Sequence, residues 1–235
     1  MEEMTVEEHV EELRKRIIVI IIALLTACFF IYPFTDRMIS SIKNFYLIEG
    51  VRIIALNPVE TIIARINISI FTALFLISPL VIYELYMFIK PALIENEIRT
   101  LKNFSFFAYL LFFTGILFAL FILLPLATKF LLRYTISSGI TPMLSLSNLV
   151  NYIVLVAFIF GLVFETPIVV YLLVRFGITS SKEIAEKRRY VYVAVFIVGA
   201  MITDPSPLTQ IMVALPMILL FELGLYFAKN YESSL

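Results

Sequence analysis

The sequence has few of the side chains from which chemical sites are built. Charged residues occupy 15% of the 235 positions, and there is a single cysteine, Cys28, and a single histidine, His9. One cysteine excludes an internal disulfide and a cysteine metal cluster, and one histidine argues against a metal site or a His-based triad. No nucleotide-binding loop of the form G-x-x-x-x-G-K-[ST] occurs. We therefore expect no metal, no cofactor and no enzymatic activity.

Net charge gives no reason to expect a nucleic-acid partner, because 18 basic and 18 acidic residues cancel. Apolar residues are abundant instead: they make up 61% of the chain and the mean hydropathy is +1.00, whereas soluble domains have roughly 45–50% apolar residues. The first apolar run ends without a small-residue cleavage site, so we expect it to stay as an anchor. The composition predicts an all-α membrane protein that forms a single domain over residues 1–235.

Six apolar runs predict six transmembrane helices, since a hydrocarbon core about 30 Å thick needs about 20 apolar residues as helix. The last two runs look short, and the proline-containing segment 203–207 between them predicts a tight helical hairpin. This hairpin either packs within the chain or provides a contact surface for another membrane protein. The predicted spans are residues 17–33, 66–89, 104–128, 152–174, 190–202 and 208–227.

The basic residues of the loops predict the orientation of the chain. Twelve of the eighteen lie in the N-terminal segment, near residues 90–102 and 175–189, and at the C-terminus, against six on the opposite side. Both termini are therefore expected in the cytoplasm. Residues 1–16 then start an amphipathic cytoplasmic helix, and residues 34–65 form a long periplasmic loop with short helices.

Acidic residues near the N-terminus have two interpretations. The segment Thr5-Val6-Glu7-Glu8 is typical of a capping box, and the helix it starts should continue into the first span with Glu12 and Arg16 one turn apart. These residues are explained either as a solvated face with helix-supporting ion pairs or as a docking surface for a cationic peptide. Carboxylates can bind a guanidinium bidentately and so distinguish arginine from lysine. Glu95 and Glu97 add carboxylates on the same side.

Glu165 is predicted near the middle of the fourth span, where a charge costs about 2.5–3.5 kcal/mol on insertion scales. Pro167 should loosen the helix at this point. Glu165 is therefore either a functional contact or a buried, hydrogen-bonded structural acid. Gln210 and Glu222 are weaker cases of the same kind, and Glu84 is expected to reach the membrane interface.

Six segments that follow one another in order resemble the TatC family, the multispanning subunit of the twin-arginine protein translocase. The resemblance extends over nearly the full length, and its segments are residues 9–16, 88–93 with Glu97 and Arg99, 164–167, 177–179, 187–191, and 214–217 continuing into 221–224.

The resemblance implies a receptor that binds the paired arginines in signal peptides of folded proteins and assembles with the single-span subunits TatA and TatB. In the family pattern, Glu12 and Glu97 match the cytoplasmic acids for the arginine pair, with Arg14 in the adjoining basic motif. Glu165 matches the intramembrane acid, and Gln210 lies in the region associated with TatA or TatB contact. The resemblance further implies a bacterial inner-membrane location, an oligomeric complex surrounded by lipid, and the proton motive force as the source of energy.

The sequence departs from the family pattern at Asp204, which precedes a proline instead of following two, and at Asn67, where relatives often have lysine. Two other functions stay open. One is a proton- or cation-coupled secondary transporter that uses Glu165. The other is a membrane-embedded hydrolase, which would need a base that His9 cannot supply from the other side of the membrane.

Overall fold

The computed structural model describes residues 6–90, 95–202 and 206–233, and within these ranges the side chains of residues 6, 8, 95–97 and 99–103 are not described. In this part of the chain, five helical stretches are long and apolar enough to cross a membrane. They are His9–Tyr46, Val59–Ile89, Phe104–Ser137, Leu146–Arg175 and Pro207–Glu232.

The chain divides into two compact units. Unit 1 comprises residues 1–45, 52–110 and 143–154, and unit 2 comprises residues 46–51, 111–142 and 155–235.

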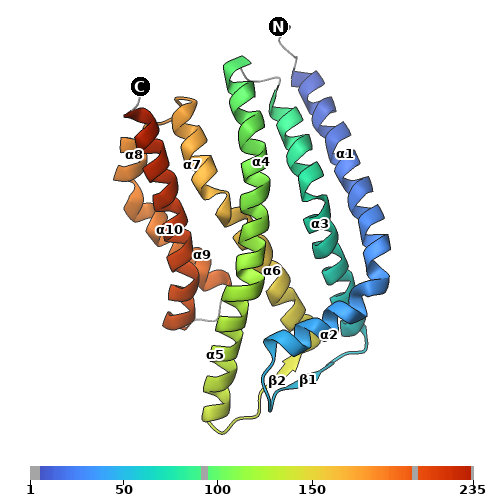
Figure 1. The fold of residues 1–235 in the computed structure, drawn as a ribbon. Coiled ribbons are helices and arrows are strands. Elements are labelled where there is room, and N and C mark those ends of the chain that lie inside the picture. Colours follow the sequence, from blue (N-terminus) through green and yellow to red (C-terminus); the bar gives the residue numbers. More distant parts are fainter. Residues whose placement is uncertain (1–5, 91–94, 203–205, 234–235) are drawn as a thin grey trace. The chain divides into compact units, whose positions relative to one another are not determined.

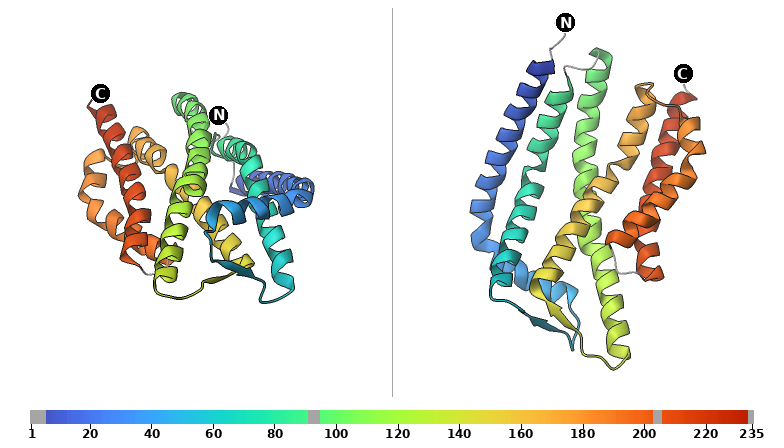
Figure 2. Two further views of the ribbon diagram at one scale, coloured as in Figure 1. Left: turned by 60° about the horizontal axis from the view of Figure 1, so that its bottom comes forward. Right: turned by 180° about the vertical axis from the view of Figure 1, so that it is seen from behind.

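Unit 1 is built around a pair of antiparallel helices, α1 (Val6–Ile31) and α3 (Val59–Ile89), which lie side by side (Figures 1 and 2). α1 is continuous from the polar N-terminal stretch into the apolar stretch, as the sequence predicts. Thr5, the first residue of the predicted capping box, lies outside the described residues. The start of α1 and the end of α3 are therefore at the same end of unit 1.

The segment between these two helices is more ordered than a loop. A 3₁₀ turn, η1 (Tyr32–Phe34), leads into α2 (Thr35–Tyr46), which confirms the predicted short helix. Two strands, β1 (Arg52–Ile54) and β2 (Met143–Ser145), form a parallel pair that the all-α prediction did not include. α3 starts at Val59, earlier than the predicted span, because Glu60 is held by the Ser145 hydroxyl (3.0 Å) and the Leu56 amide (3.2 Å).

The third span is longer than predicted and contains a π-helical turn. α4 (Glu95–Phe118) passes into η3 (Ala119–Leu123) and then α5 (Leu124–Ser137). In a π turn the carbonyl of Leu120 would bond the amide of residue 125, but that residue is proline and has no N–H. The Tyr46 hydroxyl donates to this carbonyl instead, at 2.7 Å.

The predicted span 152–174 is two helices, α6 (Leu146–Phe164) and α7 (Thr166–Arg175), separated at Glu165. Pro167 accounts for the break, because it lacks an amide and its ring clashes with the preceding turn. α7 packs against α10 (Pro207–Glu232) so closely that a Cβ on Gly224 would lie 2.7 Å from the Cα of Pro167. Apolar side chains from both helices form the core there: Val170, Val174, Phe221, Leu225 and Ala228.

The last two predicted spans differ from each other in length. After the short α8 (Ser181–Glu186), α9 (Arg188–Ile202) has 15 residues, which makes it roughly 22 Å long. This is short for a span, as predicted. The expectation of a short final helix is wrong, because α10 continues through Pro216 and reaches 26 residues. Residues 203–205 of the predicted hairpin turn, including Asp204, lie outside the described residues.

Candidate functional site

Two carboxylates share one guanidinium at the end of unit 1 where α1 begins and α3 ends. The Nε and Nη2 atoms of Arg16 both donate to Oε1 of Glu12, with Nε at 3.1 Å. Nη1 of Arg16 donates to Oε2 of Glu84, on α3, at 2.8 Å. We call these three residues the α1/α3 carboxylate cluster. Glu12 and Arg16 lie one turn apart on α1, and Arg16 also contacts Glu84, which is 68 positions further along the chain.

The α1/α3 carboxylate cluster is largely shielded from water. The side chains of Glu12 and Arg16 are 18% exposed, and that of Glu84 is 12% exposed. The second oxygen of Glu12, Oε2, is buried and has no hydrogen-bond partner among the described residues. A buried acceptor of this kind carries a desolvation cost that a donor from outside would relieve. Two carboxylates against one guanidinium leave an excess of one negative charge, which suits a cationic ligand.

The neighbouring residues of α1 differ in exposure. Arg14 is exposed, and Lys15 forms an ion pair at 2.8 Å with Glu11 in which both side chains are mostly exposed. The His9 ring stacks on Phe88 of α3 with centroids 4.4 Å apart, which gives the only histidine of the sequence a packing role. The polar stretch of α1 is thus fixed against α3 by an aromatic contact and an ion pair.

Glu97 lies in the first turn of α4, but its side chain falls outside the described part of the chain. Its helix begins at the same end of unit 1 as α1 (Figure 1). The structure therefore brings together Glu12 and Glu84, while the position of the Glu97 carboxylate stays a prediction. Sequence reasoning missed the partner of Glu84, because nothing in the spacing of residues 16 and 84 indicates that they meet.

Glu165 occupies the break between α6 and α7, as the proline suggested. It is partly buried, and its Oε1 atom is buried without a hydrogen-bond partner in the described residues. The backbone around it remains bonded, since the Glu165 amide donates to the Leu162 carbonyl at 3.1 Å and its carbonyl accepts from the Val169 amide at 3.0 Å. The two interpretations of Glu165, a functional contact and a buried, hydrogen-bonded structural acid, therefore both stay predictions.

Gln210 connects α9 and α10 in unit 2. Its Nε2 donates to the Phe196 carbonyl of α9 at 3.0 Å, and it lines a shallow hollow of about 440 Å³. The other lining residues all belong to α9: Tyr192, Val193, Phe196, Ile197 and Ala200. The hollow is mainly apolar with one amide at its edge, a surface on which another apolar helix can pack.

Glu222 has a second polar cluster around it that the sequence did not reveal. Its Oε2 accepts from Nη2 of Arg188 at 2.7 Å, and its Oε1 accepts from the Tyr192 hydroxyl at 2.6 Å. Glu222 is on α10 and its two partners are on α9, so the contacts fasten these helices together. Both carboxylate oxygens are satisfied. We call these three residues the α9/α10 cluster.

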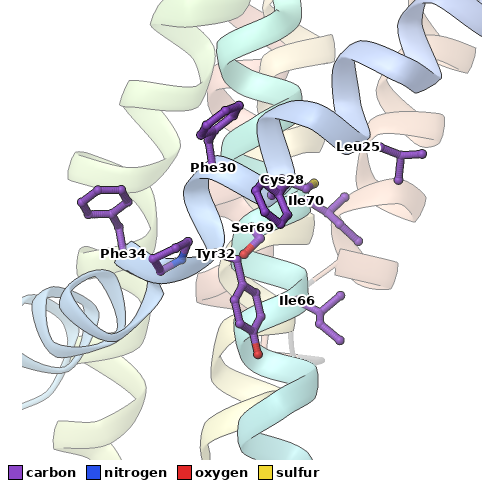
Figure 3. A pocket seen from close by; sticks show the side chains of 10 residues that line it. Leu25, Cys28, Phe30, Tyr32, Phe34, Ile66, Ser69 and Ile70 are labelled. Carbon is purple, nitrogen blue, oxygen red and sulfur yellow. The ribbon is translucent and has the colours of Figure 1, made fainter.

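A further hollow of about 620 Å³ lies between α1 with η1 and α3 in unit 1 (Figure 3). Its lining includes Leu25, Phe30, Phe34, Ile66 and Ile70, and no charged residue takes part. Such a surface suits apolar chains and lacks the convergent polar groups of a solute site. The described residues also contain no group of three or more His, Cys, Asp or Glu side chains that could hold a metal ion.

Comparison with known proteins places the chain in one family. A family model described as "Sec-independent protein translocase protein (TatC)" matches residues 8–216. The TatC protein of Aquifex aeolicus (strain VF5) is 35% identical over 229 residues, which is 96% of this chain and 95% of that protein. The TatC protein of Escherichia coli (strain K12) is 32% identical over 226 residues, covering 95% of this chain and 87% of that protein.

A solved structure described as the twin arginine translocase receptor TatC superposes with a TM-score of 0.83 at 35% identity, covering 95% of this chain and 99% of that one. A structure of TatC in DDM gives a TM-score of 0.84 at 35% identity, covering 94% and 99%. Members of this family are subunits of a protein translocase and not enzymes. The chain therefore belongs to the TatC family, as a multi-pass inner-membrane component of the Sec-independent, twin-arginine protein translocase.

Proposed function

We propose that this chain is the signal-peptide receptor of the translocase and that Glu12 and Glu97 bind the paired arginines of folded export substrates, with Arg14 beside them. The observation that carries the proposal is the Glu12 carboxylate. It accepts two N–H donors from a guanidinium and keeps a buried oxygen without a partner in the described residues. A carboxylate that binds one guanidinium in this environment has the chemistry to bind another.

The arrangement of unit 1 supports the participation of two carboxylates. Glu12 is near the start of α1, and Glu97 is in the first turn of α4, which begins at the same end of the unit (Figure 1). In this proposal, adjacent arginines of one peptide contact both helices from this end. The related structure described as a twin arginine translocase receptor also agrees with a receptor function.

We further propose that α9 and α10 recruit the single-span subunits TatA and TatB, with Gln210 and Glu165 as polar contacts inside the membrane. α9 is too short to match the hydrocarbon core unaided. Its outward side chains Val193 and Ile197 are 59% and 56% exposed, next to the hollow at Gln210. In this proposal both termini face the cytoplasm, and transport of the folded passenger draws on the proton motive force.

Peptide binding to the purified protein in detergent tests the receptor function. A peptide with two consecutive arginines should bind Glu12→Gln and Glu97→Gln at least about tenfold more weakly than the unchanged protein, since each loses a charge-assisted hydrogen bond. The preference over a peptide with two lysines should also shrink. Glu11→Gln is the matched control, because Glu11 is adjacent on α1 but 65% exposed. Unchanged affinity and unchanged preference in both variants would refute the proposal.

A further inference from the structure

The α1/α3 carboxylate cluster contains an arginine of the chain itself at the position proposed for a visiting arginine. Arg16 contacts Glu12 through Nε and Nη2 and contacts Glu84 through Nη1. A peptide guanidinium that binds Glu12 must therefore either share this carboxylate with Arg16 or displace it. The other oxygen, Oε2, has no partner in the described part of the chain and is buried. A second guanidinium therefore cannot share Glu12 unless side chains of the cluster move.

We propose that Arg16 is an internal placeholder for the peptide arginine: it occupies Glu12 in the empty receptor and is retained by Glu84 when the peptide takes its place. The inference rests on the proposed signal-peptide binding at Glu12. It assigns a positioning role to Arg16 and Glu84, neither of which is among the residues proposed above to contact the arginine pair.

The hydrogen-bond geometry favours displacement. A guanidinium bonds a carboxylate most strongly when two N–H groups meet the two oxygens side by side. Arg16 does not achieve this with Glu12, because both of its donors converge on Oε1, and Oε2 has no partner among the residues that the structure describes. A visiting guanidinium can form the side-by-side pair with both oxygens. The exchange therefore replaces an incomplete pairing with a complete one.

Glu84 removes the main cost of the exchange. An arginine released from its carboxylate inside a shielded cluster would be an uncompensated charge, which is strongly unfavourable. Arg16 already has one donor on Glu84, at 2.8 Å, and the Glu84 side chain is only 12% exposed. When the peptide arginine arrives, the cluster contains two carboxylates and two guanidiniums and its excess negative charge is neutralised.

The exchange also contributes to selection of arginine over lysine. To displace Arg16, the incoming side chain must replace the directed N–H hydrogen bonds that Arg16 donates to Glu12 in a partly dehydrated site. An ammonium group is a strongly hydrated point charge without the planar fork of a guanidinium. A lysine peptide therefore competes poorly with the internal arginine, even where its net charge is the same.

Binding of the two-arginine peptide to cluster variants tests the placeholder. Arg16→Gln removes the competitor, so the peptide should bind about tenfold more tightly, on the scale of one charge-assisted hydrogen bond. Glu84→Gln leaves Arg16 with Glu12 alone, so the peptide should bind about tenfold more weakly on the same scale. In the Arg16→Gln background, Glu84→Gln should change the affinity by less than about twofold, because there is no internal arginine left to retain.

Arg16→Lys and Lys15→Gln complete the series. Arg16→Lys keeps the charge, so it protects folding if Arg16→Gln does not fold, and it should bind the peptide more tightly than the unchanged protein but less tightly than Arg16→Gln. Lys15→Gln removes a neighbouring, exposed charge and should leave the affinity unchanged, which excludes a general charge effect. Weaker or unchanged binding in folded Arg16→Gln or Arg16→Lys would overturn the placeholder. Failure of the receptor function is distinguishable, since Glu12→Gln would then leave binding unchanged.

Discussion

The α1/α3 carboxylate cluster and the α9/α10 cluster both pair arginine with glutamate, but in different ratios. In the α9/α10 cluster one carboxylate, Glu222, has one arginine and one tyrosine hydroxyl, and both of its oxygens are satisfied. In the α1/α3 carboxylate cluster two carboxylates share one arginine, and Oε2 of Glu12 lacks a partner in the described residues. In the α9/α10 cluster the unused atom is a donor, Nε of Arg188, which is buried without a partner in the described residues. A satisfied carboxylate fastens helices, whereas an acid excess with an unused acceptor is a property of a binding site for a cation.

The acid that fastens helices and the acid proposed to bind a peptide differ in the number of carboxylates per arginine around them, and burial does not distinguish them. Glu222 is 33% exposed, while Glu12 is 18% exposed, so the more shielded acid is the one with the unused oxygen. Leaving a shielded acceptor without a partner costs stability. Such a cost is retained in proteins chiefly where function gains from it. The predictions below start from this difference.

The largest effect on stability is expected for Glu222→Gln. Removal of this charge leaves Arg188 without its ionic partner and should lower the free energy of unfolding by about 1–2 kcal/mol, below the full value for a charged hydrogen bond because the Arg188 side chain is 40% exposed. Glu12→Gln should leave stability unchanged or raise it, because Arg16 still has Glu84. Thermal unfolding in detergent, followed by circular dichroism, measures both. Equal losses in the two variants would remove the distinction between the clusters.

Tyr192→Phe should have a smaller effect in the same cluster. It removes the hydroxyl that donates to Oε1 of Glu222, and the loss of one such bond typically costs about 1 kcal/mol. The ring remains, so its edge-to-face contact with Phe221 is kept. The melting temperature should fall, while two-arginine peptide binding stays as before. A change in peptide affinity would show that the α9/α10 cluster is not purely structural.

Replacement of Glu165, in unit 2, should change stability less than replacement of Glu222 or Tyr192. Because Oε1 of Glu165 has no partner among the described residues, Glu165→Gln should change the unfolding free energy by less than about 0.5 kcal/mol. Export of a twin-arginine reporter should nevertheless decrease if this acid contacts a partner helix. Glu186→Gln, an exposed site in α8, is the control. A decrease in melting temperature as large as that of Glu222→Gln would show that Glu165 is a structural acid.

Solute uptake by vesicles containing this protein alone would favour the transporter alternative.

The smallest effect is expected for Lys15→Gln. The Lys15–Glu11 pair lies one residue from the α1/α3 carboxylate cluster, but its side chains are 73% and 65% exposed, so water screens the interaction. Neither the melting temperature nor the affinity for the two-arginine peptide should change measurably. A clear effect on either would mean that exposed charges of α1 matter as much as shielded ones, and the contrast between the clusters would lose its basis.

Much of the fold could be predicted from the sequence because hydrophobic length is a local property. Five of the six predicted spans lie in long apolar helical stretches, and the break at Glu165 follows from Pro167 within a few residues. Proline was a less dependable signal elsewhere. Pro216 did not shorten α10, since the neighbouring turns of a long packed helix tolerate one missing hydrogen bond.

The candidate site could be predicted only in part. Glu12 stood out because it shares a polar helical face with Arg16, a relation set by the helical repeat. The expectation that Glu84 reaches the interface did not include its contact with Arg16, which completes the cluster. Glu222 gave only a weak signal in the sequence but joins two helices. The strand pair β1–β2 was missed as well, because three-residue strands have too few side chains to show alternation.

By itself, the sequence determined that this is a membrane protein, roughly where its long apolar helices lie along the chain, and which family it resembles. These properties depend on apolar length, proline chemistry and ordered motifs, all of which are local. Only the tertiary structure decided which acids are satisfied and which are not. Hydrogen bonds between residues 16 and 84, or 188 and 222, depend on helices packing at contact distance, and no spacing along one chain encodes that distance.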